Sequence, residues 1–315
     1  MSTQSRAAAS HDEFNRNSLF NMKGRVALVT GSETYALHSP GAGTGIGLMA
    51  TQALAVNGAK VYIAGRSTDK LDNVVETYGR DIEGEIIPLQ GDVTDKADVA
   101  RLAAELARRE ECLCILVNNA GVSSASLTTE TEAAGLQAAE ELRRNLFDTD
   151  KTTLEDWVDV YRTNVASVFF VTTALLPLLQ KSSERHDGWS GTVINITSIS
   201  GLIKSAQHHF SYNASKGAAV QLTRMLAAEV ANSGLKVRIN SIAPGVFPSE
   251  MTTKEESDEY QKSHIPKEKY ADKVPAARPG RDEDMAQAVL FLAANQYLNG
   301  QTVAVDGGYT LAAGM

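Results

Sequence analysis

The sequence has few cysteines, no excess of positive charge and no apolar run long enough to cross a bilayer. Two cysteines in 315 residues exclude a small disulfide-stapled scaffold. Lys and Arg number 30 against 38 Asp and Glu, a net charge of −8, which favours neither a nucleic acid nor an anionic membrane as partner. The most apolar stretch, 165–179, contains Pro177 and falls short of the roughly 18 to 20 residues of a membrane span. We therefore expect a small-molecule partner.

What is present is typical of a soluble globular protein: 43% of the residues are hydrophobic and 22% are charged. Cys112 and Cys114 lie two apart in an apolar run, where a disulfide between them is sterically poor. No Cys or His pair has the spacing of zinc ligands, so we predict buried thiols in a reducing compartment and no metal site. Residues 1–22 are polar, include acidic residues and lack the apolar core of a signal peptide. They predict a flexible tail on a cytoplasmic protein.

From Gly24 onward, short apolar runs alternate with helical patterns. Such continuous apolar runs are typical of strands buried on both faces. The seven candidate strands are Arg25–Thr30, Lys60–Gly65, Gly84–Leu89, Cys112–Asn118, Gly191–Thr197, Lys236–Ile242 and Thr302–Val305. Helices are expected near 45–57, 68–78, 96–109, 154–180, 212–233 and 283–294. This alternation predicts an α/β fold with a doubly wound, parallel, seven-stranded sheet in one domain over residues 23–315.

Three segments interrupt the alternation. Residues 32–41 insert into the first turn from strand to helix, and 123–153 lengthen the connection after the fourth strand, with a possible exposed helix at 130–145. Residues 247–280 are rich in charge and proline and follow the sixth strand. A long loop at the carboxyl end of a strand is placed to cover a ligand crevice, so we expect 247–280 to form a substrate lid.

The first strand ends in a glycine-rich turn. Thr30 and Gly31 precede the ten-residue insertion, and Gly43, Thr44, Gly45, Ile46 and Gly47 follow it at the start of a helix. Glycines at this place let the backbone approach a pyrophosphate, which the N–H groups and dipole of the helix N-terminus would bind. The alternative is a glycine loop without a ligand.

Arg66 stands at the end of the second strand, where an acidic residue would bind the adenosine ribose of NAD. A guanidinium suits a 2′-phosphate instead. The sequence thus favours NADP(H) over NAD(H), unless Arg66 is only a solvated charge.

Tyr212 and Lys216 lie four residues apart in a predicted helix and so share one face. Lowering a tyrosine pKa from about 10 to about 7 requires roughly 4 kcal/mol. One ammonium about 6 Å away supplies roughly 3 kcal/mol at an effective dielectric of 20, and an oxidised nicotinamide would add the rest. The pair can therefore act as a general acid and base near neutral pH.

Taken together, these motifs resemble the short-chain dehydrogenases/reductases. The resemblance runs from about Met22 to Leu311 with every motif in order, and is greatest to fungal proteins similar to the 3-oxoacyl-(acyl carrier protein) reductase of rhamnolipid synthesis. The motifs are the glycine-rich turn, Asp92-Val93, Asn118-Asn119-Ala120-Gly121, Asn164, Ser198 with Gly201, Tyr212-Asn213-Ala214-Ser215-Lys216, Pro244-Gly245 and Val305-Asp306-Gly307-Gly308.

The resemblance implies a Rossmann-like fold and a role for each matching position. Tyr212 would exchange a proton with the substrate oxygen, Lys216 would lower its pKa and hold the nicotinamide ribose, Ser198 would stabilise charge on the same oxygen, and Asn164 would hold a water.

The remaining positions would bind the cofactor. Asn118, Ala120 and Gly121 would line the adenosine side, together with Asp92 and Val93. Pro244, Gly245, Val246 and Ser249 would line the nicotinamide carboxamide. Family members often carry Thr where this chain has Ser249.

The insertion at 32–41 is the main departure from the family pattern, because it lies where the pyrophosphate would bind. It is either a loop that bulges away from the site or the result of a gene-model or splicing difference. The residues predict a cytoplasmic, NADP(H)-dependent ketoreductase of fatty acid or secondary metabolism, acting on a ketone or secondary alcohol such as a 3-oxoacyl thioester. The alternatives are an NADP-dependent alcohol or polyol dehydrogenase and a non-catalytic relative. The resemblance implies a homodimer or homotetramer.

Overall fold

The computed structural model describes residues 11–31 and 43–314. Seven strands form one parallel sheet in the order β3-β2-β1-β4-β5-β6-β7. The order reverses between β1 and β4, which places a crevice at the carboxyl ends of these two strands. The strands are β1 (Val26–Thr30), β2 (Lys60–Gly65), β3 (Glu85–Gln90), β4 (Ile115–Asn118), β5 (Gly191–Ile196), β6 (Val237–Pro244) and β7 (Thr302–Val305). The predicted parallel seven-stranded sheet is confirmed.

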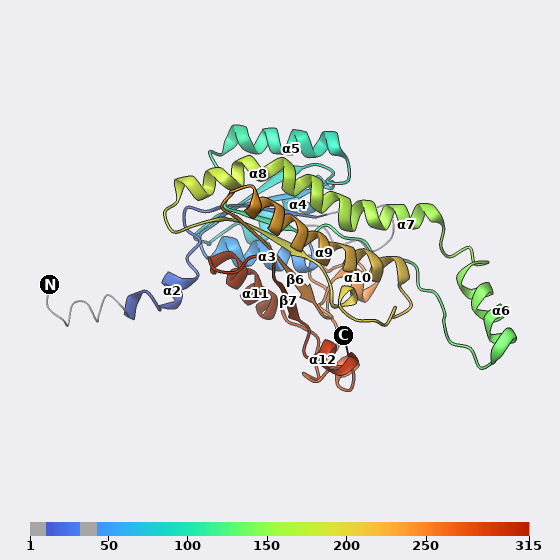
Figure 1. The fold of residues 1–315 in the computed structure, drawn as a ribbon. Helices are drawn as coiled ribbons and strands as arrows, with labels where there is room; N and C mark the ends of the chain where they lie inside the picture. Colours follow the sequence, from blue (N-terminus) through green and yellow to red (C-terminus); the bar gives the residue numbers. More distant parts are fainter. Residues whose placement is uncertain (1–10, 32–42, 315) are drawn as a thin grey trace, which may run out of the picture.

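Helices cover both faces of the sheet (Figure 1). One face packs against α3 (Gly45–Val56), α4 (Thr68–Tyr78) and α11 (Asp282–Ala294), and the other against α5 (Lys96–Arg109), α8 (Ser167–Arg185) and α9 (Phe210–Asn232). The two cores are built from aliphatic side chains, because strands buried on both faces expose none of their side chains to water. Leu28, Ile63, Leu116 and Ile194 are among the residues with 2% exposure or less.

A single long helical segment packs on the face of the sheet that α5 and α9 also cover, and it includes α7 (Leu154–Tyr161), the π-helical turn η1 (Arg162–Ala166) and α8. Its 32 residues are long and apolar enough to cross a membrane by length and composition, but half of its most apolar window is buried inside the fold. Packing against α5, α9 and the sheet accounts for that apolarity. The π-helical turn includes Asn164, and such bulges are frequent at functional sites.

Two shorter parts extend from this body. The helix expected at 130–145 is present as α6 (Gly135–Leu146), and Figure 1 shows it projecting away from the sheet. The described part of the expected tail contains α2 (Arg16–Leu19) and ends at Met22, which is fully buried and donates a backbone hydrogen bond to Asn57. Packing of the domain thus begins at Met22.

Four further short elements complete the fold. The lid segment 247–280 contains α10 (Glu250–Thr253) and the 3-10 turn η3 (Lys267–Tyr270), the 3-10 turn η2 (Ile199–Gly201) follows β5, and α12 (Tyr309–Ala313) ends the chain. The insertion at 32–41 lies outside the described residues.

Candidate active site

The carboxyl ends of the central strands converge on a small cavity of about 70 Å³. It is lined by Ile46, Asn119, Gly121, Ile196, Thr197, Ser198, Tyr212, Lys216, Pro244, Gly245, Phe247, Ser249, Met251 and Thr252. These residues come from β4, β5, β6, α9, the glycine-rich turn and the lid. The fold therefore brings most of the predicted catalytic and nicotinamide-side positions to one place.

Tyr212 and Ser198 are the polar pair in this cavity. Ser198 follows β5 and caps the short turn η2, where its Oγ accepts a hydrogen bond from the backbone of Ser200 at 3.1 Å. Burial raises the pKa of Tyr212, and its side-chain hydrogen bond with Ser198 acts in the opposite direction. The expected lowering of the tyrosine pKa is thus absent from the protein alone, because removing the phenolate from water outweighs the serine. Tyr212 is a phenol at neutral pH, the form that donates a proton.

Lys216 lies one helical turn after Tyr212, with its Nζ 5.7 Å from the centre of the tyrosine ring. Its side chain is 4% exposed, and its Nζ donates a hydrogen bond to the carbonyl of Ile196 at 3.0 Å. Burial lowers the pKa of Lys216 to about 8. The amine therefore changes its charge close to physiological pH, as a group that passes protons needs to do.

Asn164 is buried in the π-helical turn, and its side chain is fully engaged. Its Oδ1 accepts from the backbone N–H of Val122 at 2.8 Å, and its Nδ2 donates to the carbonyl of Val122 and to the Oγ of Ser215. A Cβ built on Gly121 would lie 3.4 Å from both Asn164 Oδ1 and Lys216 Nζ. Asn164 thus holds the loop after β4 against α9, next to the lysine.

The glycine-rich turn sits directly against the lid. Gly45 has a φ of +51°, and a Cβ there would lie 2.8 Å from the Cβ of Ser249, so only glycine fits at this position. Thr44 is the N-cap residue of α3 and is buried, as is Gly47. Gly31, at the other side of the insertion, donates a backbone hydrogen bond to Ala64.

Arg66 and Asp92, from the ends of β2 and β3, face each other. The Nη1 of Arg66 is 3.7 Å from Asp92 Oδ2, and both side chains are about a quarter exposed (28% and 27%). The Nε of Arg66 is buried and has no hydrogen-bond partner in the described part of the chain, whereas Asp92 Oδ1 accepts two hydrogen bonds from Thr94. One oxygen of the Asp92 carboxylate is already hydrogen-bonded within its own turn. Of the two side chains, the Arg66 guanidinium is therefore the one that can still donate a hydrogen bond to a ligand.

Asn118 and its neighbour Asn119 differ in how they are used. The Nδ2 of Asn118 donates to Thr172 at 3.0 Å and to Asn195 at 2.8 Å, so this side chain ties β4 to β5 and α8. Asn119 lines the cavity, and its Nδ2 is buried with no hydrogen-bond partner among the described residues. The sequence predicts that Asn118 contacts the cofactor; in the structure its amide is bonded inside the fold, and the amide of Asn119 lies at the cavity. Both stand in the same motif, and only the structure distinguishes them.

The other expected cofactor positions surround these. Thr30 bridges β1 and β4, since its Oγ1 lies within hydrogen-bond distance of Val117 and Asn119. Val93 and Ala120 are buried in the core beside α5 and α8. Gly245 packs so closely on Asp306 that a Cβ would come within 2.7 Å of it.

Val246, next in the chain, lines a separate cavity of about 140 Å³ with Tyr270 and Arg278.

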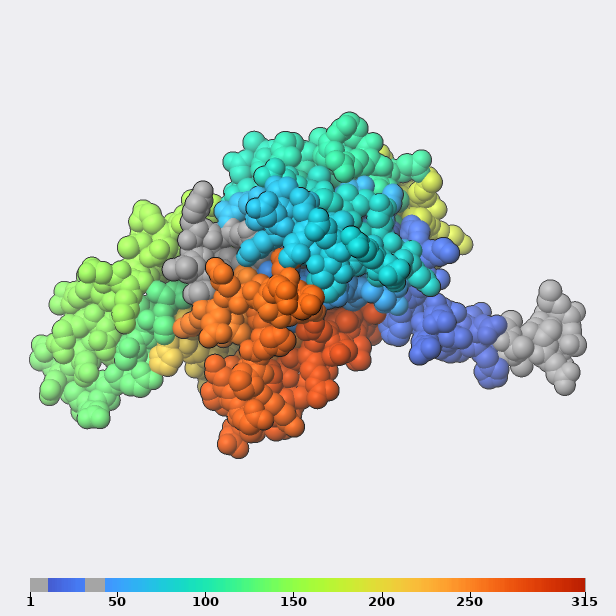
Figure 2. Space-filling view, turned by 180° about the vertical axis from the view of Figure 1, so that it is seen from behind, coloured from blue at the N-terminus to red at the C-terminus, as the bar shows by residue number. Residues whose placement is uncertain are grey.

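The lid covers the glycine-rich turn. The Nε2 of Gln261 donates to the carbonyl of Lys70 at 3.1 Å, and Lys262 Nζ donates to Gln52 of α3 at 2.9 Å. Figure 2 shows the orange lid residues lying against the blue helices of the cofactor side. A Cβ on Gly43 would be 3.2 Å from Gln261 Oε1, so the lid and the turn are in contact.

The residues present fit a nicotinamide dinucleotide. Among the described residues, the Nδ2 of Asn119 and the Nε of Arg66 are buried donors without a partner, after β4 and at the end of β2. The N-terminus of α3, with Gly45 and Gly47, supplies backbone N–H groups of the kind that bind a pyrophosphate. Between them, Ser198 and Tyr212 present two hydroxyl groups to one small cavity. This arrangement can hold a carbonyl oxygen and exchange a proton with it.

Comparisons with known proteins identify relatives of this chain. A family model described as "Enoyl-(Acyl carrier protein) reductase" matches residues 41–310. The chain is 36% identical to "Short-chain dehydrogenase/reductase PhomF" of Diaporthe leptostromiformis, over 92% of each chain. It is 33% identical to the "Rhamnolipids biosynthesis 3-oxoacyl-[acyl-carrier-protein] reductase" of Pseudomonas aeruginosa, over 93% of this chain and 98% of the relative. Among solved structures, the "Pseudomonas aeruginosa RhlG/NADP active-site complex" superposes with a TM-score of 0.71 at 32% identity, covering 92% of this chain and 98% of that one.

Proposed function

The chain belongs to the short-chain dehydrogenase/reductase family, and we propose that it is an NADP(H)-dependent reductase of a ketone, with Tyr212 as the general acid. The observation that carries the proposal is the cavity shared by Ser198, Tyr212 and Lys216, with Asn164 behind it. A family member without catalytic function has no chemical need to keep Ser198, Tyr212 and Lys216 around one cavity with Asn164 nearby.

The proton chemistry follows from the positions of the side chains. Ser198 Oγ and Tyr212 Oη bind the substrate carbonyl oxygen, and Tyr212 protonates it as negative charge develops there. Lys216, close to the tyrosine ring and with a pKa near 8, favours the phenolate that this leaves behind. The bound cofactor supplies or accepts the hydride. In the oxidising direction the same groups remove the alcohol proton.

Arg66 supports NADP(H) as the cofactor. Its guanidinium stands at the end of β2, and its buried Nε has no partner within the described residues. A 2′-phosphate would pair with this group, whereas a free ribose hydroxyl prefers an acidic acceptor. The solved structure with a TM-score of 0.71 is named as a complex with NADP.

The substrate class is proposed from the same comparison. A 3-oxoacyl thioester or a related ketone of secondary metabolism fits a relative named for 3-oxoacyl reduction at 33% identity. The lid 247–280 contributes Phe247, Met251 and Thr252 to the cavity wall, and so is placed to select the substrate.

A homo-oligomer and a cytoplasmic location belong to the same proposal. The outer surface of α7, α8 and α9 exposes apolar side chains that suit contact with a second copy: Leu154, Trp157, Val158, Phe169 and Met225.

The first test is a fluorescence titration with NADPH and NADH, made on the full chain and on a chain lacking 32–41. Micromolar or tighter binding of NADPH by the full chain, with weaker binding of NADH, supports the proposal. Binding by the shortened chain alone would show that the insertion disables the cofactor site, and would favour a non-catalytic relative.

The second test follows NADPH consumption with 3-oxoacyl thioesters and other ketones. Tyr212→Phe is expected to lower kcat by about 100-fold or more while NADPH affinity changes only a few-fold. Tyr297→Phe is the matched control, because Tyr297 is fully exposed and remote from the cavity. Near-normal turnover of Tyr212→Phe would refute the assigned acid.

A further inference from the structure

A second cluster of reactive side chains lies at the amino ends of the strands, the opposite edge of the sheet from the catalytic cavity. Cys112 and Cys114 stand just before β4, and His186 caps the C-terminus of α8. One ligand atom from each of the three lies within 4.8 Å of the other two, and Cys112 Sγ is 3.7 Å from His186 Nε2. Both cysteines are free thiols.

The separation of Cys112 and His186 matches a tetrahedral zinc site. Zinc binds thiolate sulfur at about 2.3 Å and imidazole nitrogen at about 2.0 Å, which separates a sulfur and a nitrogen ligand by roughly 3.5 Å. The 3.7 Å between Cys112 Sγ and His186 Nε2 is close to that value. Cysteine and histidine are also the ligand types that zinc prefers, whereas magnesium and calcium take oxygen ligands.

The backbone holds the three residues in place. The N–H of Cys114 bonds to Val26 of β1 at 2.8 Å, and its carbonyl accepts from Thr192 of β5. The N–H of Leu113, between the cysteines, bonds to Leu178 of α8. The N–H of His186 bonds to Ser182, and its carbonyl accepts from Trp189. Ligands fixed in this way need little reorganisation to bind an ion.

The charges around the cluster suit a neutral complex. Two thiolates and a neutral imidazole balance a divalent cation. Arg185, the nearest cation on α8, pairs with Glu111, and the guanidinium of Arg25 stacks on the Trp189 ring at 4.3 Å.

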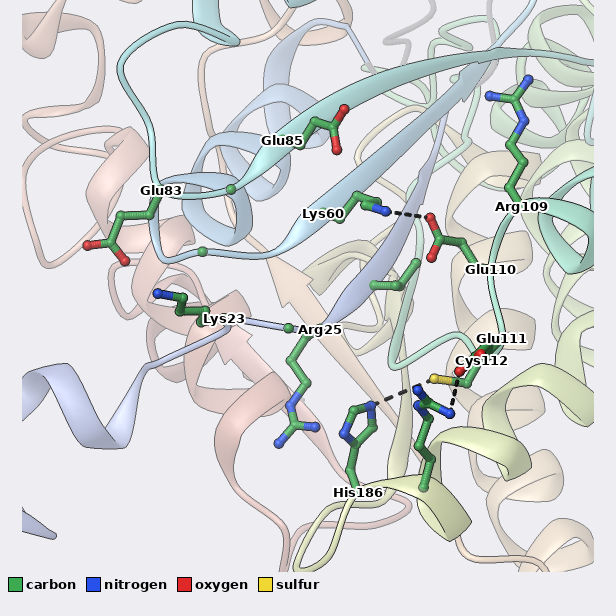
Figure 3. Close-up of a pocket in the computed structure, with 15 residues that line it drawn as sticks. Lys23, Arg25, Lys60, Glu83, Glu85, Arg109, Glu110, Glu111, Cys112 and His186 are labelled. Carbon is green, nitrogen blue, oxygen red and sulfur yellow. Dashed lines mark hydrogen bonds and ion pairs between the residues drawn. The ribbon is translucent and has the colours of Figure 1, made fainter.

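A cavity gives the cluster access to solvent. It has a volume of about 540 Å³ and has Cys112 and His186 in its wall. Figure 3 shows the imidazole of His186 directed at the sulfur of Cys112. A water molecule entering from this side would complete the four-coordinate shell.

We propose that Cys112, Cys114 and His186 form a zinc site at the amino edge of the sheet, with water as the fourth ligand. Sequence spacing predicts no such site, because His186 is 74 residues from Cys112 and comes near only through the packing of α8 beside β4. Binding converts two thiols to thiolates and releases two protons. Since burial raises the pKa of the Cys112 thiol to about 11, these protons have to be displaced by the metal.

The test uses Co²⁺ as a spectroscopic probe for zinc on the full chain, stripped of metal with a chelator. We expect one equivalent of Co²⁺ to give thiolate charge-transfer and tetrahedral ligand-field bands, and Zn²⁺ to displace it. Cys112→Ser and His186→Gln are expected to weaken binding by more than the roughly 10- to 100-fold typical of outer-shell changes.

His264→Gln is the matched control, since His264 is exposed in the lid and bonds only Asp258 among the described residues. His186 lies at the surface end of α8, so its replacement tests the site without opening the core. Equal Co²⁺ spectra and affinities in His186→Gln and wild type, or the absence of a saturable one-equivalent spectrum in wild type, would overturn the proposal. Metal binding in Tyr212→Phe, which should be unchanged, keeps this result separate from that of the proposed reductase activity.

Discussion

Replacing Lys216 by methionine should stabilise the protein at neutral pH while removing its activity. The ammonium of Lys216 is 4% exposed, and burial lowers its pKa from 10.5 to about 8. Methionine has a similar length and no charge, so it fills the same space without the unfavourable burial of an ion. Under the proposed mechanism, the protein keeps a destabilising residue here because the proton chemistry uses it.

The magnitude follows from the pKa shift. A difference of 2.5 pKa units corresponds to about 3 kcal/mol that folding loses by burying the charged lysine. Methionine also gives up the hydrogen bond from Nζ to the carbonyl of Ile196, which is worth about 1 kcal/mol. The free energy of unfolding of Lys216→Met should therefore exceed that of wild type by about 2 kcal/mol at pH 7.

The effect should depend on pH in one direction. Below pH 8 the lysine is protonated in both the folded and the unfolded chain, so burial of its charge lowers the stability of wild type by the full amount. Between pH 8 and 10.5 the folded protein binds fewer protons than the unfolded chain, and the stability of wild type rises relative to the variant. The advantage of Lys216→Met should shrink across this window and vanish near its upper end.

Urea unfolding at pH 7 and pH 10, at one protein concentration, measures the stability difference at pH 7 and its decrease at higher pH. Lys204→Met is the control, because Lys204 is exposed, and its effect should be small at both pH values. A variant less stable than wild type at pH 7, or a difference that does not change between the two pH values, would refute the argument that desolvation dominates at Lys216.

Three further substitutions test the cofactor site. Arg66→Asp should weaken NADPH binding by at least about tenfold and leave NADH binding unchanged or stronger; unchanged NADPH affinity would remove Arg66 as the phosphate partner. Gly45→Ala should cost about 1 to 2 kcal/mol of stability and weaken both cofactors, because its φ of +51° and the 2.8 Å approach to Ser249 leave no room for a methyl group; thermal melting and titration check it. Asn119→Ala should weaken cofactor binding several-fold without loss of stability, since its Nδ2 has no hydrogen-bond partner among residues 11–31 and 43–314; a large fall in the melting temperature would assign it a structural role instead.

The strands and the main helices could be predicted from the sequence because each is a local pattern. Continuous apolar runs separated by helix-length segments allow only a parallel, doubly wound sheet, and the observed strand bounds differ from the predicted ones by three residues at most. The contact of Tyr212 with Lys216 is local too, since four residues make one helical turn. Ser198 joins them because strands of one sheet end at the same edge.

The features that could not be predicted from the sequence depend on where a side chain points and on how deeply it is buried. Nothing in the pair Asn118-Asn119 tells which amide points into the core and which into the cavity. The spacing of Tyr212 and Lys216 places an ammonium near the phenol and so predicts a lowered tyrosine pKa. In the structure burial raises this pKa, and that burial depends on the lid and the sheet. The contact of Gln261 with the glycine-rich turn joins segments more than 200 residues apart.

The polarity of a parallel sheet explains why one chain can present two chemically distinct sites. All seven strands point the same way, so the carboxyl edge collects Ser198, Tyr212 and Asn119, and the amino edge collects the residues that precede the strands. Cys112 and Cys114 come directly before β4, and Asn119 directly after it. The four residues of β4 span roughly 13 Å, and the first three, Ile115, Leu116 and Val117, are fully buried aliphatic side chains. A metal ion at one edge therefore lies well away from the proton chemistry at the other, so zinc should change thermal stability more than turnover.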